Sequence, residues 1–190
     1  MKEHLQVEIK GRIIIRDLET KEIIRDATNA VHPQNMALVI SRALSRDPNG
    51  AIFNLCFGNG GTFLNSNNQI VYRPPNIVGI SSLYNQTYSV QVDDQSTGTP
   101  ISNSVLSSPS LSPAITSIVT VIAQLNANEP AGQAAADNLT TNPTTALFMF
   151  NEVGLKSADG LLLSHLTFSP WEKTANRAIE IIYTLTVSVN

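Results

Sequence analysis

Alternating apolar and polar residues at the start of the chain predict a β-hairpin. The apolar side chains recur with a period of two: Leu5, Val7, Ile9, and then Ile13 and Ile15. This period is typical of a strand with one buried face. A polar, turn-like stretch (DLETK, 17–21) follows, and residues 22–30 resume the extended pattern. Two extended segments joined by a short polar turn favour a hairpin.

The period changes at Pro33, where the sequence predicts an amphipathic helix that ends at Arg46. Apolar residues there recur at spacings of three and four, as they do on one face of an α-helix. We expect Pro33 and Asn35 to begin this helix, and either Asn29 or His32 is suited to cap it. The Asp-Pro-Asn-Gly sequence directly after the helix is a strong turn signal.

Further apolar runs predict strands without any further long helix. These runs cover residues 51–57, 114–125, 145–153, 160–168 and 177–189. Because strands and helices do not alternate, the pattern favours a mainly β protein: an antiparallel β-sandwich with one α-helix near the N-terminus. No internal repeat or linker divides the chain, so we expect residues 1–190 to form a single domain.

The middle of the chain departs from this regular pattern. Residues 63–113 are rich in Asn, Ser, Pro and Gly, with at most short strands such as 84–92. So long an irregular stretch is unusual in a compact domain, and it is normally functional or ordered by a partner. We therefore expect a long irregular central insertion, an extended loop or arm. Its part around Tyr84 is predicted to contact a neighbouring subunit or to face a lumen.

Composition narrows the classes of protein. The chain has 190 residues, of which 42% are hydrophobic, so it can bury a real core. Its net charge of −3 argues against non-specific binding of nucleic acid, which depends on Lys and Arg. No run of 18 apolar residues offers a membrane span, and the first residues are too polar for a signal peptide. The single cysteine, Cys56, fits a reducing cytoplasm and is interpreted as a small buried hydrophobe.

The basic residues are unevenly distributed. No Lys or Arg occurs between Pro74 and Leu155, a stretch that contains Asp93 and Asp94. One interpretation is a long polar loop that happens to lack basic residues. The other is a surface on which positive charge would be unfavourable, such as the wall of a channel that conducts DNA. On the second interpretation, Asp93 and Asp94 form an acidic lumen or interface.

No motif in the chain indicates catalysis or a cofactor. The sequence FGNGGT (57–62) lacks the Lys of a P-loop and the spacing of a dinucleotide fingerprint. We interpret it as a tight turn that requires positive φ at two glycines and is shaped by Gly58, Gly60 and Gly61. The histidines lack metal-binding spacing. His165 follows Ser164 in a predicted strand, so the two side chains point to opposite faces, and His165 is interpreted as a core or interface group.

The last third of the chain, residues 150–187, resembles a pattern common in virion proteins of tailed bacteriophages. In that pattern a strand ending in (N/S)-E-x-G-L precedes an Asp-Gly turn, a strand ending in F-x-P, a Lys-Thr turn and a closing strand. The matching positions are Glu152, Gly154, Leu155, Asp159, Gly160, Phe168, Pro170, Lys173 and Thr174. Residues 29–44 and 52–62 resemble the same class, in which a helix after an Asn-containing hairpin leads into a strand and a Gly-rich turn.

This resemblance implies a β-sandwich subunit of a phage neck, collar, head–tail connector or tail, assembled as a ring. We expect Glu152 and Gly154 to fix the start of the C-terminal hairpin and Trp171 to anchor the last connection. The predicted function is that of a structural protein, not an enzyme, which forms a homo-oligomeric ring at the neck or collar. It would be part of the virion, assembled in the host bacterial cytoplasm.

The predicted partners are other phage head–tail or tail proteins, with no membrane and no sequence-specific nucleic acid, although DNA passes through such a channel. No cofactor is expected. One alternative is a peripheral fibre, decoration or receptor-binding module. Exposed aromatic side chains would distinguish such a module from a ring subunit, and an aromatic content of only 6% argues against it. Another is a cell-wall hydrolase that uses Asp93, Asp94 or Glu152.

Overall fold

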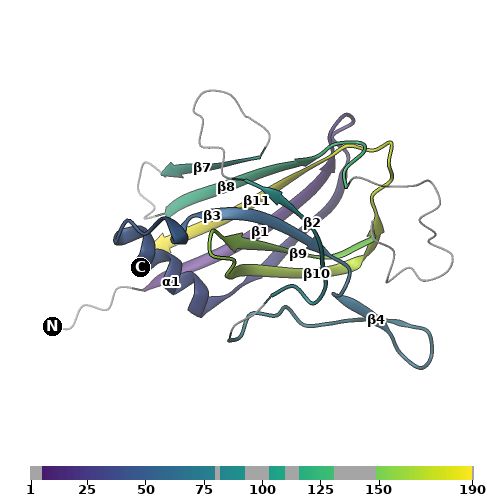
Figure 1. Ribbon diagram of the computed structural model, residues 1–190, viewed down its shortest axis with the longest axis horizontal. Helices are drawn as coiled ribbons and strands as arrows, with labels where there is room; N and C mark the ends of the chain where they lie inside the picture. The colour runs from purple at the N-terminus through teal and green to yellow at the C-terminus, as the bar shows by residue number, and fades with distance from the viewer. Residues whose placement is uncertain (1–5, 80–81, 93–102, 110–115, 131–148, 190) are drawn as a thin grey trace.

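Strands make up most of the structure, as the sequence pattern predicts. The computed structural model describes residues 6–79, 82–92, 103–109, 116–130 and 149–189 (Figure 1). The elements in chain order are β1 (Val7–Asp17), β2 (Ile23–Val31), α1 (Pro33–Leu44), a 3-10 helix η1 (Pro48–Gly50), β3 (Ile52–Gly58), β4 (Thr62–Leu64), β5 (Ile70–Tyr72), β6 (Gln86–Gln91), β7 (Ser104–Pro109), β8 (Thr116–Leu125), β9 (Met149–Ser157), β10 (Leu162–Glu172) and β11 (Ile179–Val189).

Nine of the strands form one antiparallel sheet in the order β6-β3-β9-β10-β2-β1-β11-β8-β7. Strand β2 joins the two halves of this sheet, because its residues 23–29 pair with β1 while Ala30 and Val31 pair with β10. The sheet curls so far that β6 comes within 8 Å of β8, measured between Cα atoms. The predicted sandwich of two sheets is therefore not confirmed: nine of the described strands form one curled sheet around one core.

A single large apolar core fills the inside of the curled sheet. On β1, Ile13 and Ile15 are buried while Arg12, directly before Ile13, is exposed, as a period of two requires. Both halves of the sheet contribute to the core, whose largest buried members include Ile13, Ile15, Leu55, Phe57, Leu125, Phe150, Leu155, Leu163, Ile179 and Tyr183. The predicted hairpin of β1 and β2 is confirmed.

Helix α1 begins where the sequence predicts, and His32 rather than Asn29 caps it. His32 Nδ1 accepts a hydrogen bond from the backbone N–H of Asn35 (3.2 Å), and Pro33 lies in the first turn. The amide side chain of Asn35 donates to the carbonyl oxygen of Leu162 on β10 (2.9 Å). These contacts seat the helix against one end of the sheet, at the left of Figure 1.

Strand β9 ends four residues later than predicted, at Ser157 instead of Val153, which changes the position of two residues. Because β9 continues to Ser157, Glu152 and Gly154 lie in its interior, and the prediction that they fix the start of the hairpin is wrong. The turn itself follows at residues 158–161, where Gly160 has a φ of 86°. This conformation favours glycine, so Asp159 and Gly160 lie in a turn between β9 and β10.

Strand β10 is longer than predicted and continues to Glu172. Trp171 therefore lies in the strand, paired with Phe150 and packed against the core, and not in the last connection. A register shift between Thr167 and Trp171 contains Pro170. Proline has no N–H to donate to the ladder, so a strand accommodates it at such irregularities.

The predicted insertion, residues 63–113, contributes both edges of the large sheet. Strand β6 lies within the short strand predicted at 84–92 and pairs with β3, and β7 pairs with β8. Strands β4 and β5 form a separate hairpin that projects from the body of the molecule (Figure 1). Asp93 and Asp94 lie outside the described residues, so their place in a lumen or interface stays a prediction.

Candidate functional site

The hairpin of β4 and β5, residues 62–72, is called the arm here. The chain comes back from it through the return segment, residues 73–85, of which the structure describes 73–79 and 82–85. The return segment runs along β10, where Thr167 Oγ1 donates to the carbonyl oxygen of Arg73 (2.9 Å). At the base of the arm, the hydroxyl of Tyr72 lies 2.8 Å from that of Ser169. The contact of the return segment with β9 and β10 brings together most of the residues that the sequence singles out.

The carboxylate of Glu152 lies at the centre of this contact. Its side chain is fully buried in β9. Oε1 accepts hydrogen bonds from the backbone N–H groups of Gly60 (3.0 Å) and Asn85 (2.8 Å). Oε2 accepts one from the backbone N–H of Tyr84 (2.9 Å) and one from Nε2 of His165 (3.0 Å). One side chain therefore joins the chain leaving β3, the chain returning to β6, and β10.

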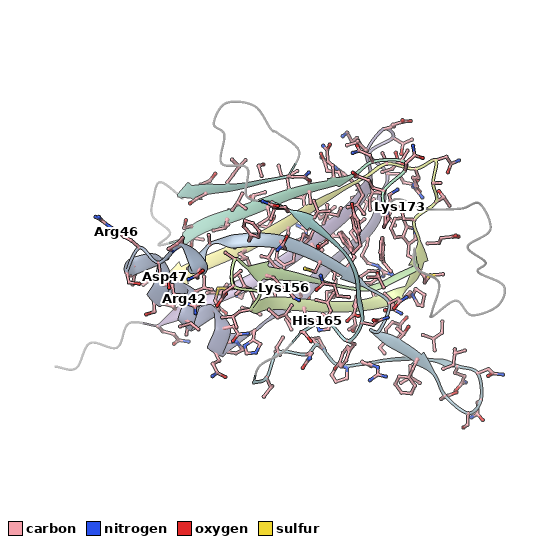
Figure 2. All side chains as sticks on the ribbon, viewed as in Figure 1. Arg42, Arg46, Asp47, Lys156, His165 and Lys173 are labelled. Carbon is pink, nitrogen blue, oxygen red and sulfur yellow. The ribbon has the colours of Figure 1, made fainter. Side chains whose placement is uncertain are left out.

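His165 is neutral in this arrangement, because its other nitrogen is an acceptor. Nδ1 accepts a hydrogen bond from the backbone N–H of Asn76 (2.8 Å), and a backbone N–H donates only. The ring proton is thus on Nε2, which donates to Glu152. Figure 2 labels His165 on β10, on the side along which the return segment runs. The interpretation of His165 as a core or interface group agrees with its full burial.

Burial and hydrogen bonding act in opposite directions on the pKa of Glu152. Burial disfavours the charged carboxylate and raises the pKa, while the hydrogen bonds from His165, Asn85, Tyr84 and Gly60 together outweigh this effect and lower it. The group is therefore ionised at neutral pH. An ionised carboxylate accepts hydrogen bonds only, which matches its four donors. We call Glu152, His165 and these donors the Glu152 anchor.

The glycines after β3 are needed for close approach rather than for turn conformation. None of Gly58, Gly60 and Gly61 has a positive φ, so the prediction of positive φ at two of them is wrong. A Cβ atom on Gly58 would lie 2.5 Å from Oε1 of Glu152. One on Gly60 would lie 2.6 Å from the backbone nitrogen of Asn85. Any side chain at these positions would force the Glu152 anchor apart.

Asn151 forms a second buried connection, which the sequence analysis missed. Its Nδ2 donates to the carbonyl oxygen of Asn59 (3.0 Å) and to Oγ1 of Thr62 (2.7 Å). Its Oδ1 accepts from the backbone N–H of Gly61 (2.7 Å). The signal was an Asn-Glu pair inside an otherwise apolar strand, Met149–Val153. Adjacent strand residues point to opposite faces, so two buried polar neighbours indicate that both faces of β9 are covered.

An apolar contact completes the attachment of the return segment. Leu83 packs with Cys56 and Leu162 in a small cluster separate from the main core. A Cβ atom on Gly154 would lie 2.7 Å from side-chain carbons of both Leu83 and Leu162, so glycine makes room for this packing. Burial raises the pKa of Cys56 to about 11, which agrees with its interpretation as a small buried hydrophobe.

Tyr84 lies at the surface end of the site. Its ring centre lies 5.7 Å from that of His165. The guanidinium carbon of Arg73 lies 5.0 Å from the ring centre of Tyr84. Arg73 also lies 5.3 Å from the ring centre of Phe63 on the arm. The hydroxyl of Tyr84 donates to the carbonyl oxygen of Pro74 (2.8 Å). These aromatic and cationic groups link the arm to the Glu152 anchor.

The structure thus brings together six of the predicted residues and separates the others. The residues that meet at the Glu152 anchor and its surroundings are Gly58, Gly60, Gly61, Tyr84, Glu152 and Gly154. Pro33 and Asn35 lie in α1, and Trp171 lies near the end of β10. The capping residue His32 also contacts the return segment, since its Nε2 lies 2.8 Å from the carbonyl oxygen of Gly79.

The geometry of this site is that of a buried hydrogen-bond network that joins three segments of the chain. Glu152 is buried and its oxygens already accept four hydrogen bonds, an arrangement unlike that of a hydrolytic carboxylate, which must contact substrate. Among the described residues, no three His, Cys, Asp or Glu side chains gather as metal ligands would. None of the helices in that part of the chain is long and apolar enough to cross a membrane.

Comparisons with known proteins add no relative to this description: no protein-family model, no curated protein and no solved structure matches the chain.

Proposed function

We propose that the chain is a structural subunit of a tailed-phage particle, which packs with copies of itself into a ring at the neck or collar. The observation that carries the proposal is the arm: a hairpin fixed at its base by buried polar contacts that exposes apolar side chains. The ring would join other head–tail or tail proteins, and the long polar stretch without basic residues would face its channel or its interfaces.

The exposed side chains of the arm favour assembly. Between 40% and 51% of the surface of Phe63, Leu64, Ile70 and Tyr72 is exposed. An isolated two-stranded hairpin is marginally stable in water, and clustered exposed apolar groups usually mark a site of interaction. A partner that covers these side chains would remove apolar surface from water and stabilise the hairpin.

The Glu152 anchor favours a mechanical role. Burying an ionised carboxylate is costly unless its oxygens are hydrogen-bonded, and hydrogen bonds are directional whereas apolar contacts are not. Here the carboxylate fixes where the arm leaves the sheet and where the return segment rejoins it. This is useful if the direction of the arm matters, as it does in a symmetric assembly.

The proposal of a phage protein rests on the sequence resemblance, and one contact in the structure supports it. Two of the stretches that carry the resemblance, 52–62 and 150–187, meet at the Glu152 anchor through the contact of Gly60 with Glu152. The Gly-rich turn and the N-E-x-G-L strand are therefore parts of one local arrangement. A sandwich-like β subunit of this class is compatible with a curled sheet around one core.

A second candidate function is a peripheral fibre, decoration or receptor-binding module. The exposed aromatic side chains that would distinguish it are present, since Phe63, Tyr72 and Tyr84 are each more than a third exposed. Aromatic rings at a protein surface are suited to stacking on sugars or on a partner protein. All three lie on the arm or at its base, so both candidate functions depend on the same surface.

The first test is the mass of the purified chain in solution, measured by light scattering after gel filtration, with negative-stain images of the peak. A ring is expected, at a defined multiple of 20.5 kDa. A monomer at all accessible concentrations would contradict the ring. Gold-labelled antibodies against the chain then distinguish the candidates on tailed particles: label at the head–tail junction supports the neck or collar, and label on fibres or capsid supports the peripheral module.

A further inference from the structure

An apolar groove lies at the opposite end of the molecule from the arm. Its walls are the start of β1, the end of β2 and one side of α1, and its volume is about 300 Å³. The lining residues, none of which is charged, are Val7, Ile9, Val31, Pro33, Met36, Ala37 and Ile40. We call this cleft the α1 groove.

The outer face of α1 extends this apolar surface. A surface helix normally presents polar side chains to water, but α1 has no charged residue before Arg42. Ile40 is partly exposed, and Leu44, one turn further along the same side of the helix, is 82% exposed. Arg42 itself is engaged with Asp47 and Asp159, away from this face. Figure 2 labels Arg42 and Asp47 close together beside the helix.

The arm has the complementary character. Residues 62–72 (TFLNSNNQIVY) contain no charged side chain, so neither surface would bury an unpaired ion against the other. In the hairpin register Leu64 pairs directly with Ile70, and these side chains lie on the same face of the arm as Tyr72. Tyr72 is fixed at the base by Ser169, which leaves the Leu64–Ile70 pair as the free apolar part of that face.

The positions of the two surfaces determine how they can meet. Figure 1 shows α1 and the arm at opposite ends of the longest axis of the molecule. The arm of one copy can therefore reach the α1 groove only of another copy. A contact between two different surfaces of identical chains is head-to-tail, and it repeats from copy to copy until the ring closes.

We propose that the arm of each copy docks in the α1 groove of the next copy, with Leu64 and Ile70 packed against Ala37 and Ile40. The proposal rests on the proposed function only in that the chain assembles with itself. It adds the pair of surfaces, the residues and the head-to-tail direction. Because no charged side chain of the arm or the groove lining takes part, assembly should withstand high salt.

A complementation experiment tests this contact. Leu64→Asp disables the arm and Ile40→Asp disables the groove, and both positions are partly exposed, so each variant should keep the unfolding temperature of the parent chain. Each variant alone should be monomeric. Their mixture retains one intact arm and one intact groove, so it should give a species with the mass of two chains and no larger ring.

Cysteine cross-linking gives the direction of the contact. Chains carrying Ile70→Cys and chains carrying Ile40→Cys should form a disulfide-linked dimer when mixed and oxidised, and neither should do so alone. The matched control is Ile70→Cys with Ile23→Cys, an exposed isoleucine far from α1 in the fold, which should give no dimer. The native Cys56 is buried and does not compete.

The outcomes separate the contact from the function. If the unmodified chain assembles but both aspartate variants still assemble, or if Ile70→Cys links to itself, the arm-in-groove contact is wrong while self-assembly stands. If the unmodified chain is a monomer, the proposed ring fails and the contact fails with it. Another occupant of the groove, such as residues 1–5 or a different protein, would appear as failure of the mixture to form the two-chain species.

Discussion

Two regions of this molecule are stabilised in different ways. The half of the sheet formed by β1, β8 and β11 pairs in unbroken antiparallel register and buries apolar side chains at alternate positions. The attachment of the arm and the return segment to β9 and β10 depends instead on Glu152, His165 and Asn151, with only a small apolar cluster around Leu83. The first region makes the fold, and the second fixes where the arm leaves it.

The comparison shows why the two regions should respond differently to substitution. Apolar packing is non-directional and shared among many neighbours, so its loss weakens the whole sheet. Hydrogen bonds to a buried carboxylate are directional, and loss of one partner leaves the others without acceptors. We therefore expect core substitutions to change global stability and anchor substitutions to change mainly the arm and the return segment.

The largest effect is expected for Phe150→Ala in the core. Phe150 is fully buried and its ring centre lies 5.0 Å from that of Phe57. Removing such a side chain leaves a cavity and typically costs about 3–5 kcal/mol of the free energy of unfolding. Chemical denaturation would measure this loss, and amide exchange should increase in all strands together. An effect confined to one strand would contradict a single shared core.

A smaller and more local effect is expected for Glu152→Gln. Glutamine replaces one carboxylate oxygen by an NH2 group, which donates and does not accept. Because each oxygen of Glu152 accepts from two donors, the NH2 group faces two donors in either position. The expected loss of the free energy of unfolding is about 1–3 kcal/mol. A change of tautomer at His165 does not help, because it places a ring proton against the N–H of Asn76. Amide exchange should increase at Gly60, Tyr84 and Asn85 before it does in β1 and β11.

The matched control for Glu152→Gln is Glu19→Gln, at an exposed glutamate in the turn after β1. It makes the same chemical change without a buried network, so no change in exchange or stability is expected. If Glu152→Gln increased amide exchange equally in the return segment and in β1, the Glu152 anchor would not open independently of the rest of the sheet.

Acid should reproduce part of this effect in the unmodified chain. The folded-state pKa of Glu152 lies below its ordinary value, so the carboxylate binds fewer protons in the folded than in the unfolded state. Its contribution to stability is therefore complete above the ordinary glutamate pKa of about 4.3 and is lost as the pH falls through the lowered pKa. The stability difference between the unmodified chain and Glu152→Gln should shrink over this acid range; a constant difference would argue against an ionised Glu152.

The smallest effect is expected for Arg73→Met at the surface of the site. Methionine keeps an unbranched stem and removes the charge that lies over the rings of Tyr84 and Phe63. A partly exposed cation–π contact contributes about 0.5–1 kcal/mol, so only a slight loss of stability is expected. Assembly should persist, because the Leu64–Ile70 pair is unchanged. Loss of the ring with unchanged stability would place Arg73 in the interface itself.

The strands and the helix were largely determined by the local sequence. The alternation through Ile13 and Ile15 gave β1 its buried face, and the shift to a period of three and four at Pro33 gave α1 its start. Both patterns are local, since the periods of 2 and 3.6 follow from backbone geometry alone. The ends of β9 and β10 could not be predicted in this way, because partner strands decide how far pairing continues.

The candidate site was determined only by the tertiary structure. Gly60 and Glu152 are 92 positions apart, and no local pattern indicates that the N–H of one meets the carboxylate of the other. The sequence showed glycines after β3 and a glutamate in an apolar strand, but it assigned the glycines to turn conformation and the glutamate to a hairpin. Their common role appears when the return segment covers β9, because a buried charge requires donors from whichever segments lie within hydrogen-bonding distance.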